Sequence, residues 1–389
     1  MRDPFAIVRP AYGGGSLADV LPSVLGALGV PGASNALDLP VVDKIAVLLV
    51  DGLGWHQLPP AAACAPTLAD VLEGRLGSAR RLTAGFPSTT PTSLVSLGTG
   101  AVPGAHGVLG FTVNVPGTTR VLNHIDWWGD PDPLRWQPLH TQFDLARAAG
   151  VAVSVVSRPE FAGSGLTVAA NRGGAYRGAS GVDEIAATVL DALATAPAPA
   201  LVYAYHADLD RIGHLCGVDS EPWRAAAAEV DRLLSRLVEG LPAGAALLVT
   251  ADHGQLDVPE DHRFDLAKDP RLRAGVRIVA GEPRVRYLHT APGAAADVIA
   301  AWQGVLGAAA WVGSRDEAVA AGWFGPVPEG HLARLGDVVV ACRDRYAVLS
   351  SRSEPPVVAQ LVAYHGSFTA VEMEIPLLLL GAGSVPIGG

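Results

Sequence analysis

The residues best suited to chemistry surround a threonine that precedes a predicted helix. The stretch Gly85-Phe-Pro-Ser-Thr-Thr-Pro-Thr-Ser-Leu places Thr90 directly before Pro91, and apolar residues follow at helical spacing. A Thr at the N-cap and a Pro at the first helical position mark a helix start. The free N–H groups and the positive end of the helix dipole suit a phosphate. The alternative is that Thr90 is an ordinary helix cap without a ligand.

Two apolar stretches of the buried parallel-strand type end in acidic residues. Residues 45–50 run into Asp51, and residues 246–250 run into Asp252 and His253. Ligands of open α/β sheets collect at the carboxyl ends of strands, so these side chains are well placed for chemistry. The alternative for Asp51 is a cap on the next helix.

A third acidic motif follows the strand predicted over residues 200–205. Asp210 and His214 are four positions apart, which places both on one face of a helical turn and lets them share a cation. Asp208 is the alternative ligand if this turn is not helical, and a solvated acidic loop is the alternative for the whole segment. His365 lies before the strand predicted over residues 375–380.

The remaining patterns indicate the elements that must position these residues. Helices are predicted over residues 17–28, 139–149, 182–193 and 222–239, alternating with strands, as in a doubly wound α/β sheet that brings the acids to one edge. Residues 258–349 differ, with more Arg, short strands at 285–288 and 338–341, a helix at 294–306 and a turn near 316. We therefore expect a core formed by residues 1–257 and 350–389, and a small inserted α+β lobe at 258–349.

Composition excludes several classes of partner. The net charge of −10 and the absence of a Lys/Arg block argue against a nucleic-acid polymer or a membrane as the partner. The three cysteines are widely spaced without a C-x-x-C pair, which indicates reduced thiols. The first residues lack the apolar core of a signal peptide, and no apolar run approaches the roughly 18 residues of a membrane span. We expect a cytoplasmic protein; the sequence gives no indication of its oligomeric state.

The acids and histidines together suit metal ions. Three buried carboxylates without cations would repel one another and raise one another's pKa, and metal relieves that repulsion. Mixed His and carboxylate ligation suits zinc, and less often manganese or iron. We therefore expect two divalent metal ions, most simply Zn²⁺. The plausible ligands are Asp51, Asp210, His214, Asp252, His253 and His365, with Thr90 beside them.

The order of these motifs resembles a known family. The chain carries Asp51-Gly, then Phe-Pro-Ser-Thr-Thr-Pro-Thr-Ser with Thr-Gly-x-x-Pro-x-x-His-Gly, then Asp-x-x-Gly-His, Asp-His-Gly and a late His-Gly. This series is similar to the type I phosphodiesterase/nucleotide pyrophosphatase family of the alkaline phosphatase superfamily, over about residues 44–257 and 360–381. The resemblance implies an alkaline phosphatase-like three-layer α/β/α sandwich with a mostly parallel central sheet.

The resemblance also implies a role for each matching position. Thr90 would be the nucleophile. One metal would be held by Asp51, Asp252, His253 and the Thr90 oxygen, and the second by Asp210, His214 and His365. Most family members carry an Asn after the nucleophile that contacts a phosphoryl oxygen, but here no Asn follows Thr90 before Asn114. Ser93, Thr92 or a backbone N–H are the candidates for that substrate contact.

The function expected is metal-dependent hydrolysis of a phosphodiester or nucleotide pyrophosphate bond in a small-molecule substrate, through a covalent phosphothreonine. A sulfatase is excluded, because the chain has no Cys/Ser-x-Pro-x-Arg sequence. One alternative is a phosphomonoesterase or phosphonate hydrolase with the same centre. A second is a catalytically silent metal-binding protein, and a third treats the Asp and His residues as scattered surface groups.

Overall fold

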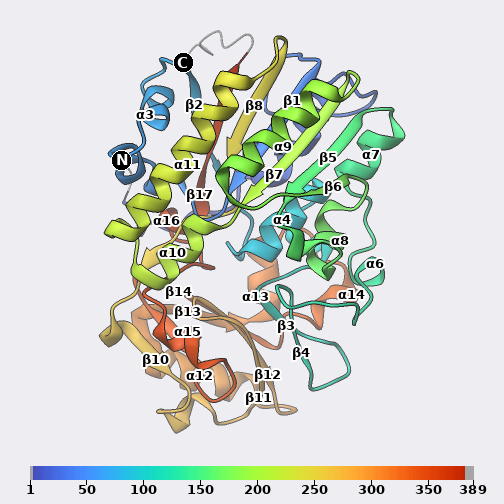
Figure 1. The fold of residues 1–389 in the computed structure, drawn as a ribbon. Helices are drawn as coiled ribbons and strands as arrows, with labels where there is room; N and C mark the ends of the chain where they lie inside the picture. The colour runs from blue at the N-terminus through green and yellow to red at the C-terminus, as the bar shows by residue number, and fades with distance from the viewer. Residues whose placement is uncertain (1–2, 382–389) are drawn as a thin grey trace.

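The computed structural model describes residues 3–381, and its centre is a seven-stranded sheet (Figure 1). The strands are parallel except the last, β17, which runs antiparallel to both of its neighbours. In spatial order they are β2 (Gly77–Thr83), β17 (Glu374–Gly381), β8 (Ala245–Thr250), β1 (Lys44–Val50), β7 (Ala200–His206), β5 (Ala152–Ser157) and β6 (Ala175–Gly178). The predicted mostly parallel sheet is confirmed.

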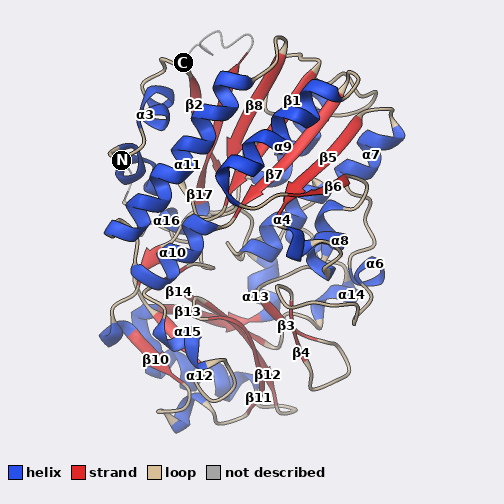
Figure 2. Cartoon of the chain, in the orientation of Figure 1, coloured by secondary structure: helices blue, strands red, loops and turns tan. Residues whose placement is uncertain are grey.

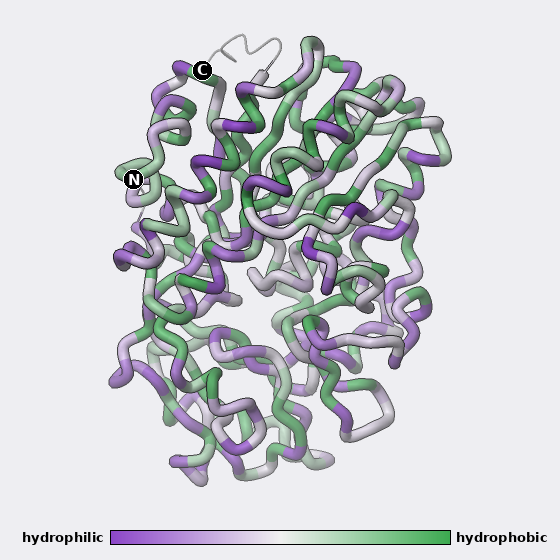
Figure 3. Tube along the Cα trace, in the orientation of Figure 1, coloured by the Kyte–Doolittle hydropathy of each residue, from purple (hydrophilic) through white to green (hydrophobic). Residues whose placement is uncertain are grey.

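The central strands are apolar on both faces because helices cover both sides of the sheet. Every residue of β8 and all of β1 after Lys44 are buried, and Figure 3 shows hydrophobic residues concentrated along these strands. The register pairs Val50 of β1 with His206 of β7, and Leu49 with Thr250 of β8. The three strands therefore end at the same level.

The helices form layers on the two sides of the sheet. Figure 2 shows α9 (Gly181–Thr195) and α11 (Glu221–Gly240) side by side in front of it. A second group of helices surrounds the one that begins at Thr90. The helices of that second group, which pack on one another, are α1 (Val20–Ala27), α4 (Thr90–Thr99), α7 (Gln142–Ala148) and α8 (Gly165–Asn171). This is the predicted three-layer α/β/α arrangement.

A second sheet lies below the core in Figure 1 and is formed by residues between β8 and β17. It is antiparallel, in the order β11 (Val276–Glu282), β12 (Val285–Thr290), β14 (Val338–Cys342) and β13 (Ala310–Ser314). Trp302 of α12 (Ala295–Leu306) is fully buried in a separate apolar cluster with Leu288 and Val340. We call residues 258–349 the lobe.

One lobe element differs from the sequence prediction. The turn expected near residue 316 is a helix, α13 (Arg315–Ala320). Ser314 and Glu317 form a capping box, in which each side chain accepts a hydrogen bond from the other residue's backbone N–H. This S-x-x-E signature was legible in the sequence.

Buried contacts join the lobe to the core. Arg284, between β11 and β12, donates two hydrogen bonds to the Glu372 carboxylate, at 2.9 and 2.7 Å, and both side chains are fully buried. Arg334, which follows α14 (Glu329–Leu332) in the lobe, donates a hydrogen bond to the Gly107 carbonyl of the core at 2.6 Å.

Residues 110–136 form an irregular segment beside the site. They contain the short ladder of β3 (Thr112–Asn114) with β4 (Val121–Asn123), and then α6 (Pro133–Trp136). Trp127 and Trp136 are buried, whereas Trp128 is 61% exposed.

Shorter elements complete the part of the chain that the structure describes. They include α2 (Leu58–Ala62), α3 (Pro66–Leu72), α5 (Pro103–His106), α10 (Asp208–Cys216), α15 (Pro356–Gln360), α16 (Ala370–Met373), β9 (Leu256–Asp257), β10 (Arg263–Asp265), β15 (Ala347–Leu349) and β16 (Ala363–Tyr364). Among residues 3–381, no helix is both long and apolar enough to cross a membrane. All three cysteines are free.

Candidate active site

Thr90 lies at the start of α4, where the chain turns from the sheet edge into the helix. The N-cap is Thr89, with extended backbone (φ −136°, ψ 146°), and Thr90 is the first helical residue. The predicted helix start is therefore correct, but the cap lies one residue earlier, because Pro91 fits anywhere in a first turn whose N–H groups are unpaired. The Thr90 hydroxyl is 3.1 Å from His253 Nε2.

A first cluster forms where β1 and β8 end side by side. Asp51, Asp252 and His253 are buried, and one ligand atom from each lies within 4.8 Å of the others. His253 Nε2 is 3.5 Å from Asp51 Oδ1 and 3.2 Å from Asp252 Oδ2. The common ending level of the strands produces this cluster directly.

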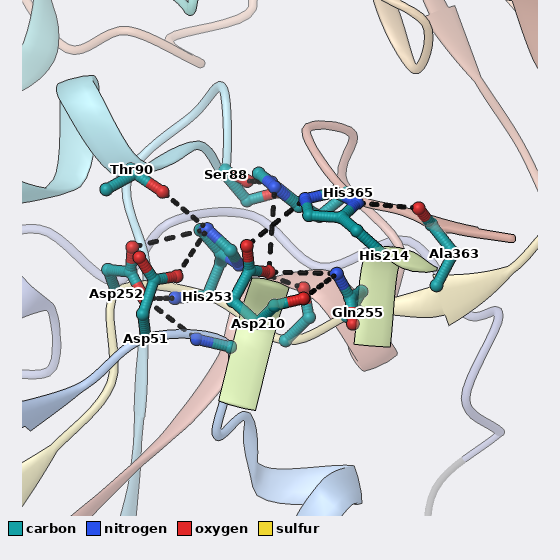
Figure 4. Close-up of polar contacts among 12 residues, drawn as sticks. Asp51, Ser88, Thr90, Asp210, His214, Asp252, His253, Gln255, Ala363 and His365 are labelled. Carbon is teal, nitrogen blue, oxygen red and sulfur yellow. Dashed lines mark hydrogen bonds and ion pairs between the residues drawn. The ribbon is translucent and has the colours of Figure 1, made fainter. Parts of the chain in front are cut away.

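A second cluster joins α10 to the loop before α16. His214 Nε2 is 3.1 Å from Asp210 Oδ2, and His365 Nε2 is 3.9 Å from Asp210 Oδ1. The imidazole of His365 stacks on that of His253, with ring centroids 3.6 Å apart, so the two clusters are adjacent (Figure 4). Asp208 is not part of either cluster, because it pairs with Arg158 at 2.5 Å.

Backbone carbonyls fix the orientation of the second-cluster histidines. His214 Nδ1 lies 2.7 Å from the Ala363 carbonyl, and His365 Nδ1 lies 2.9 Å from the Ser88 carbonyl (Figure 4). A carbonyl only accepts, so each Nδ1 carries the proton and each Nε2 presents a lone pair to the centre. This is the arrangement that metal-ligating histidines adopt.

Two side chains that the sequence did not single out orient the acids. Gln255 Nε2 donates to Asp210 Oδ1 at 2.9 Å (Figure 4). The Tyr205 hydroxyl donates to Asp51 Oδ2. The sequence signal for Tyr205 is its position near the end of a predicted strand. Gln255 has no such signal.

Without cations, the buried carboxylates of the centre are unfavourable in their ionised form. Burial, followed by the charges of Asp252 and Asp210, raises the pKa of Asp51 well above its usual value, and burial also raises the pKa of Asp252. Burial opposes ionisation of Asp210, but the neighbouring His214 holds its pKa below the usual value. Asp51 Oδ1 and Asp252 Oδ2 are buried without hydrogen-bond partners. Orphaned carboxylate oxygens beside imidazole lone pairs fit divalent cations.

Gly52 allows the first cluster to meet the second. Its φ of +74° is left-handed, and a Cβ there would lie 2.9 Å from Asp210 Cβ. Glycine is therefore required for the chain leaving β1 to pass this close to α10.

A pocket opens beside Thr90, which forms part of its wall. Its wall is rich in aromatic side chains, including Trp128, Phe161, Tyr203 and Tyr205. Ser157, Ser164, Thr167 and Asn171 add polar groups. Such a mixture of apolar walls and a few polar atoms is typical of small-molecule sites.

The residues predicted to contact the phosphoryl group have different surroundings. The Ser93 hydroxyl donates to the Asp252 backbone carbonyl at 2.8 Å, so its proton is already used. The Thr92 hydroxyl is buried without a partner. The amide of Asn114 donates to the carbonyls of Thr118 and Arg120, where it holds the β3–β4 turn.

The layered sheet, with paired Asp/His clusters at the ends of its strands, is an alkaline phosphatase-like fold. The model of one family, type I phosphodiesterase/nucleotide pyrophosphatase, matches residues 45–368, and the chain belongs to that family. It is a metal-dependent hydrolase that acts on phosphoester bonds. A search among curated protein sequences finds no match.

Solved structures share the fold at low sequence identity. Murine ectonucleotide pyrophosphatase/phosphodiesterase 5 aligns with a TM-score of 0.70 and 19% identity, covering 87% of this chain and 88% of that chain. An inactive variant of the same murine protein, in complex with AMP, aligns with a TM-score of 0.69. Phosphonoacetate hydrolase from Sinorhizobium meliloti 1021 in complex with phosphonoformate aligns with a TM-score of 0.65 and 20% identity, covering 89% of this chain and 91% of that chain.

Proposed function

We propose that this protein hydrolyses a phosphodiester or nucleotide pyrophosphate bond in a small-molecule substrate, with Thr90 as the nucleophile that becomes phosphorylated. The observation that carries the proposal is the Thr90 hydroxyl, 3.1 Å from His253 Nε2 at the edge of two adjoining clusters of acids and histidines. A serine or threonine hydroxyl is a weak nucleophile until a base or a metal lowers its pKa.

Two divalent cations, zinc in the simplest case, are assigned to the two clusters. Asp51, Asp252, His253 and the Thr90 oxygen would hold one, and Asp210, His214 and His365 would hold the other. The unpartnered carboxylate oxygens of Asp51 and Asp252 support this assignment. When bound, such ions lower the pKa of a hydroxyl or water and neutralise charge on the attacking and leaving oxygens.

The chain itself supplies the nucleophile and its position. Thr90 Oγ1 attacks phosphorus and loses its proton, and the bond from phosphorus to the leaving oxygen breaks with its electron pair. The leaving group takes up a proton. Water then attacks the phosphorus of the phosphothreonine and loses a proton, and the bond from phosphorus to Thr90 Oγ1 breaks. Oγ1 takes up a proton, and the phosphorylated product leaves. The first-turn N–H groups of α4 lie where they can donate to the equatorial phosphoryl oxygens.

The pocket beside Thr90 supports a substrate with an organic group. None of its lining residues is Lys or Arg, which favours a singly charged diester over a dianionic monoester. Its aromatic walls suit a flat ring. A nucleotide fits this description, and one structural relative is described in complex with AMP.

A substrate panel tests the proposal. Purified protein, with its metal content measured, is assayed with bis-p-nitrophenyl phosphate, p-nitrophenyl phosphate, a dinucleoside pyrophosphate and phosphonoacetate. We expect the diester or pyrophosphate to be cleaved with the highest kcat/KM, and a chelator to abolish the activity. Failure of metal-replete protein to cleave any of the esters would instead support a silent metal-binding protein.

Phosphonate hydrolysis is the second candidate. It is supported by the structural likeness to phosphonoacetate hydrolase, which is bound to phosphonoformate in one structure. Cleavage of phosphonoacetate with a higher kcat/KM than bis-p-nitrophenyl phosphate would favour this candidate over the first.

A further inference from the structure

A second pocket lies in the lobe, at the start of β11. Part of its lining is apolar, because Leu266 belongs to the lobe's hydrophobic cluster and Val276 and Val279 pack against that cluster. Three other lining residues are arginines, and none of the lining residues is acidic. A chain with a net charge of −10 therefore places three positive charges around one partly apolar pocket.

This pocket is separate from the active site. The last residue of β11, Glu282, lies against Gly366, whereas the pocket is lined by residues from the first half of the same strand. The strand from Val276 to Glu282 spans about 20 Å, at about 3.3 Å per residue. The pocket shares no lining residue with the pocket beside Thr90.

A β-bulge in β11 shapes the pocket. The pairing of β11 with β12 slips by one position between Val276 and Ile278, so Arg277 is an extra residue in the ladder. Side chains of a regular strand alternate between its two faces, so Val276 and Val279, three positions apart, would point to opposite faces. Both residues nevertheless line the pocket, together with Arg277. The bulge therefore gathers side chains that a regular strand would separate.

The three arginines have no acidic partner in the described part of the chain. Arg277 and Arg352 are exposed and make no hydrogen bond or ion pair with other described residues. Arg273 donates through Nη1 to the carbonyls of Leu266 and Ala267, both at 2.7 Å. These two bonds hold its guanidinium at the pocket and leave Nε and Nη2 available to a ligand.

The acids of the surrounding segments are engaged elsewhere. Asp269 forms an ion pair with Arg271, with a shortest distance of 2.6 Å. Asp265 accepts a hydrogen bond from the Ser351 hydroxyl at 2.7 Å, and Glu354 pairs with an arginine outside the pocket. The positive charge of the pocket is therefore not neutralised by an ion pair among residues 3–381.

We propose that this pocket binds a small molecule in which a dianionic phosphate or phosphonate group is attached to an apolar or aromatic body. The planar guanidinium group presents paired N–H donors whose geometry matches phosphate oxygens. Three cations favour a doubly charged group over a singly charged one. The apolar part of the lining gives the attached body a surface to bury. The inference goes beyond the proposed function, since it concerns binding outside the catalytic pocket.

Phenylphosphonate is the probe, because it combines a phenyl ring with a phosphonate and contains no phosphoester bond. Its binding to the metal-loaded full chain is measured by isothermal titration calorimetry at about pH 8, where the probe is mostly dianionic. We expect Arg277→Gln and Arg352→Gln each to weaken binding at this pocket by about tenfold, and the double variant to abolish it. Any binding at the active site is common to all these proteins and cancels in the comparison.

Arg271→Gln is the matched control. It removes one positive charge from an exposed position of the same lobe, but Arg271 does not line the pocket, so binding should be unchanged. Both side chains that are replaced in the pocket are exposed and unpaired, so the variants should fold, and equal melting temperatures check this. Benzenesulfonate, with the same ring and a single negative charge, should bind at least about tenfold more weakly than phenylphosphonate.

Four results would overturn the proposal. The double variant could bind phenylphosphonate as well as the original protein does, or Arg271→Gln could weaken binding as much as the pocket variants. Equal affinity for benzenesulfonate would reject the preference for a dianion. Binding of vesicles that contain phosphatidic acid, without binding of phenylphosphonate, would assign the pocket to a lipid headgroup instead of a small molecule.

Discussion

Neighbouring groups donate a hydrogen bond to one oxygen of each first-cluster acid and leave the other oxygen without one. Tyr205 donates to one oxygen of Asp51, while the other oxygen has no hydrogen-bond partner. Gly52 donates its N–H to Asp252 Oδ1 at 3.2 Å, and Asp252 Oδ2 is likewise without a partner. Buried polar atoms are normally paired, so each orphan oxygen indicates a missing ligand.

Replacing Thr90 by Ala removes the proposed nucleophile. We expect turnover of a diester to fall by at least about 1,000-fold, with the fold retained, because the side chain makes one hydrogen bond and the helix keeps its cap at Thr89. Steady-state kinetics and the melting temperature measure the two effects. Thr99→Ala at the other end of α4 is the control and should keep its activity. A near-normal rate in Thr90→Ala would exclude the covalent route.

Gln255 offers a test of ligand orientation. Gln255→Met removes the hydrogen bonds to Asp210 and should weaken metal binding by about 10–100-fold without preventing folding. Competition with a chelating dye measures the affinity. Gln303→Met, which loses a hydrogen bond to Val312 in the lobe, should leave the affinity unchanged. Equal affinities in the two variants would show that Gln255 does not position Asp210 for metal.

At this scale the sequence predicted the acids and histidines but not the groups that orient them. Asp51, Asp252 and His253 follow apolar strands, and Asp210 and His214 have helical spacing, so each carried a local signal. Gln255 acts through a contact between distant segments, and its own sequence neighbourhood carries no such signal. For Ser93 the sequence suggested a substrate contact, but its hydroxyl donates to the backbone carbonyl of Asp252.

The secondary-structure elements form the site by ending, or beginning, at the same edge of the sheet. Parallel β1 and β8 end side by side, and antiparallel β17 starts at the same edge, so the loop before it delivers His365. The starting position of α4 depends on its close packing against α8. A Cβ at Gly98 of α4 would lie 1.9 Å from the Ala170 carbonyl oxygen of α8. The position of the proposed nucleophile therefore depends on a glycine eight residues away.

Gly98→Ala tests this dependence. We expect a loss of about 1–3 kcal/mol in the free energy of unfolding, since the backbone contact must open. Urea denaturation measures it. The control is Gly304→Ala in α12, where nothing lies within 4 Å of the added methyl group and the helix should gain about 0.5–1 kcal/mol. Similar effects at both glycines would mean that α4 and α8 accommodate the methyl group.

Most elements were predictable because their hydrophobic periods are strong. The strands at residues 45–50 and 246–250 and the long helix beginning near Pro222 agree with β1, β8 and α11 within a residue or two. Two errors lie where local hydrogen bonds decide the structure, and the edge strand β2 of the central sheet was not predicted at all. The cap of α4 moved from Thr90 to Thr89, and the turn near residue 316 is a capped helix.

The whole molecule consists of a sheet layered with helices, and a lobe that faces the active edge. Residues 258–349 form a sheet and an apolar cluster of their own, yet the last residue of β11, Glu282, lies against Gly366, the residue after His365. Sequence composition indicated a separate lobe, but not that one of its strands packs against the segment that carries His365. The cytoplasmic location and the domain boundaries stay predictions.

Metal removal should destabilise the whole protein, and more so at higher pH. In the metal-free protein the pKa values of Asp51 and Asp252 are raised, so their contribution to stability is present at low pH and is lost as pH rises through the folded-state pKa. Bound cations favour the ionised acids and reverse this loss. Saturation at about 1,000 times the Kd adds roughly 4 kcal/mol.

The measurement is the melting temperature with and without a chelator at about pH 6 and about pH 8. We expect the drop on chelation to be larger at the higher pH. Glu317→Gln protein should show the same pH trend, because it leaves the clusters intact. An equal fall in melting temperature at the two pH values would mean that bound metal does not change the ionisation of Asp51 and Asp252.

The buried pairing of Arg284 with Glu372 has a consequence for exchanging parts between relatives. Arg284 belongs to the lobe and Glu372 to the core, and both are shut away from solvent. A chimera that grafts another lobe without an arginine at this point would leave a lone anion inside the protein, at a cost of about 3–5 kcal/mol. Lobe and core must therefore be transplanted with both partners, or with neither.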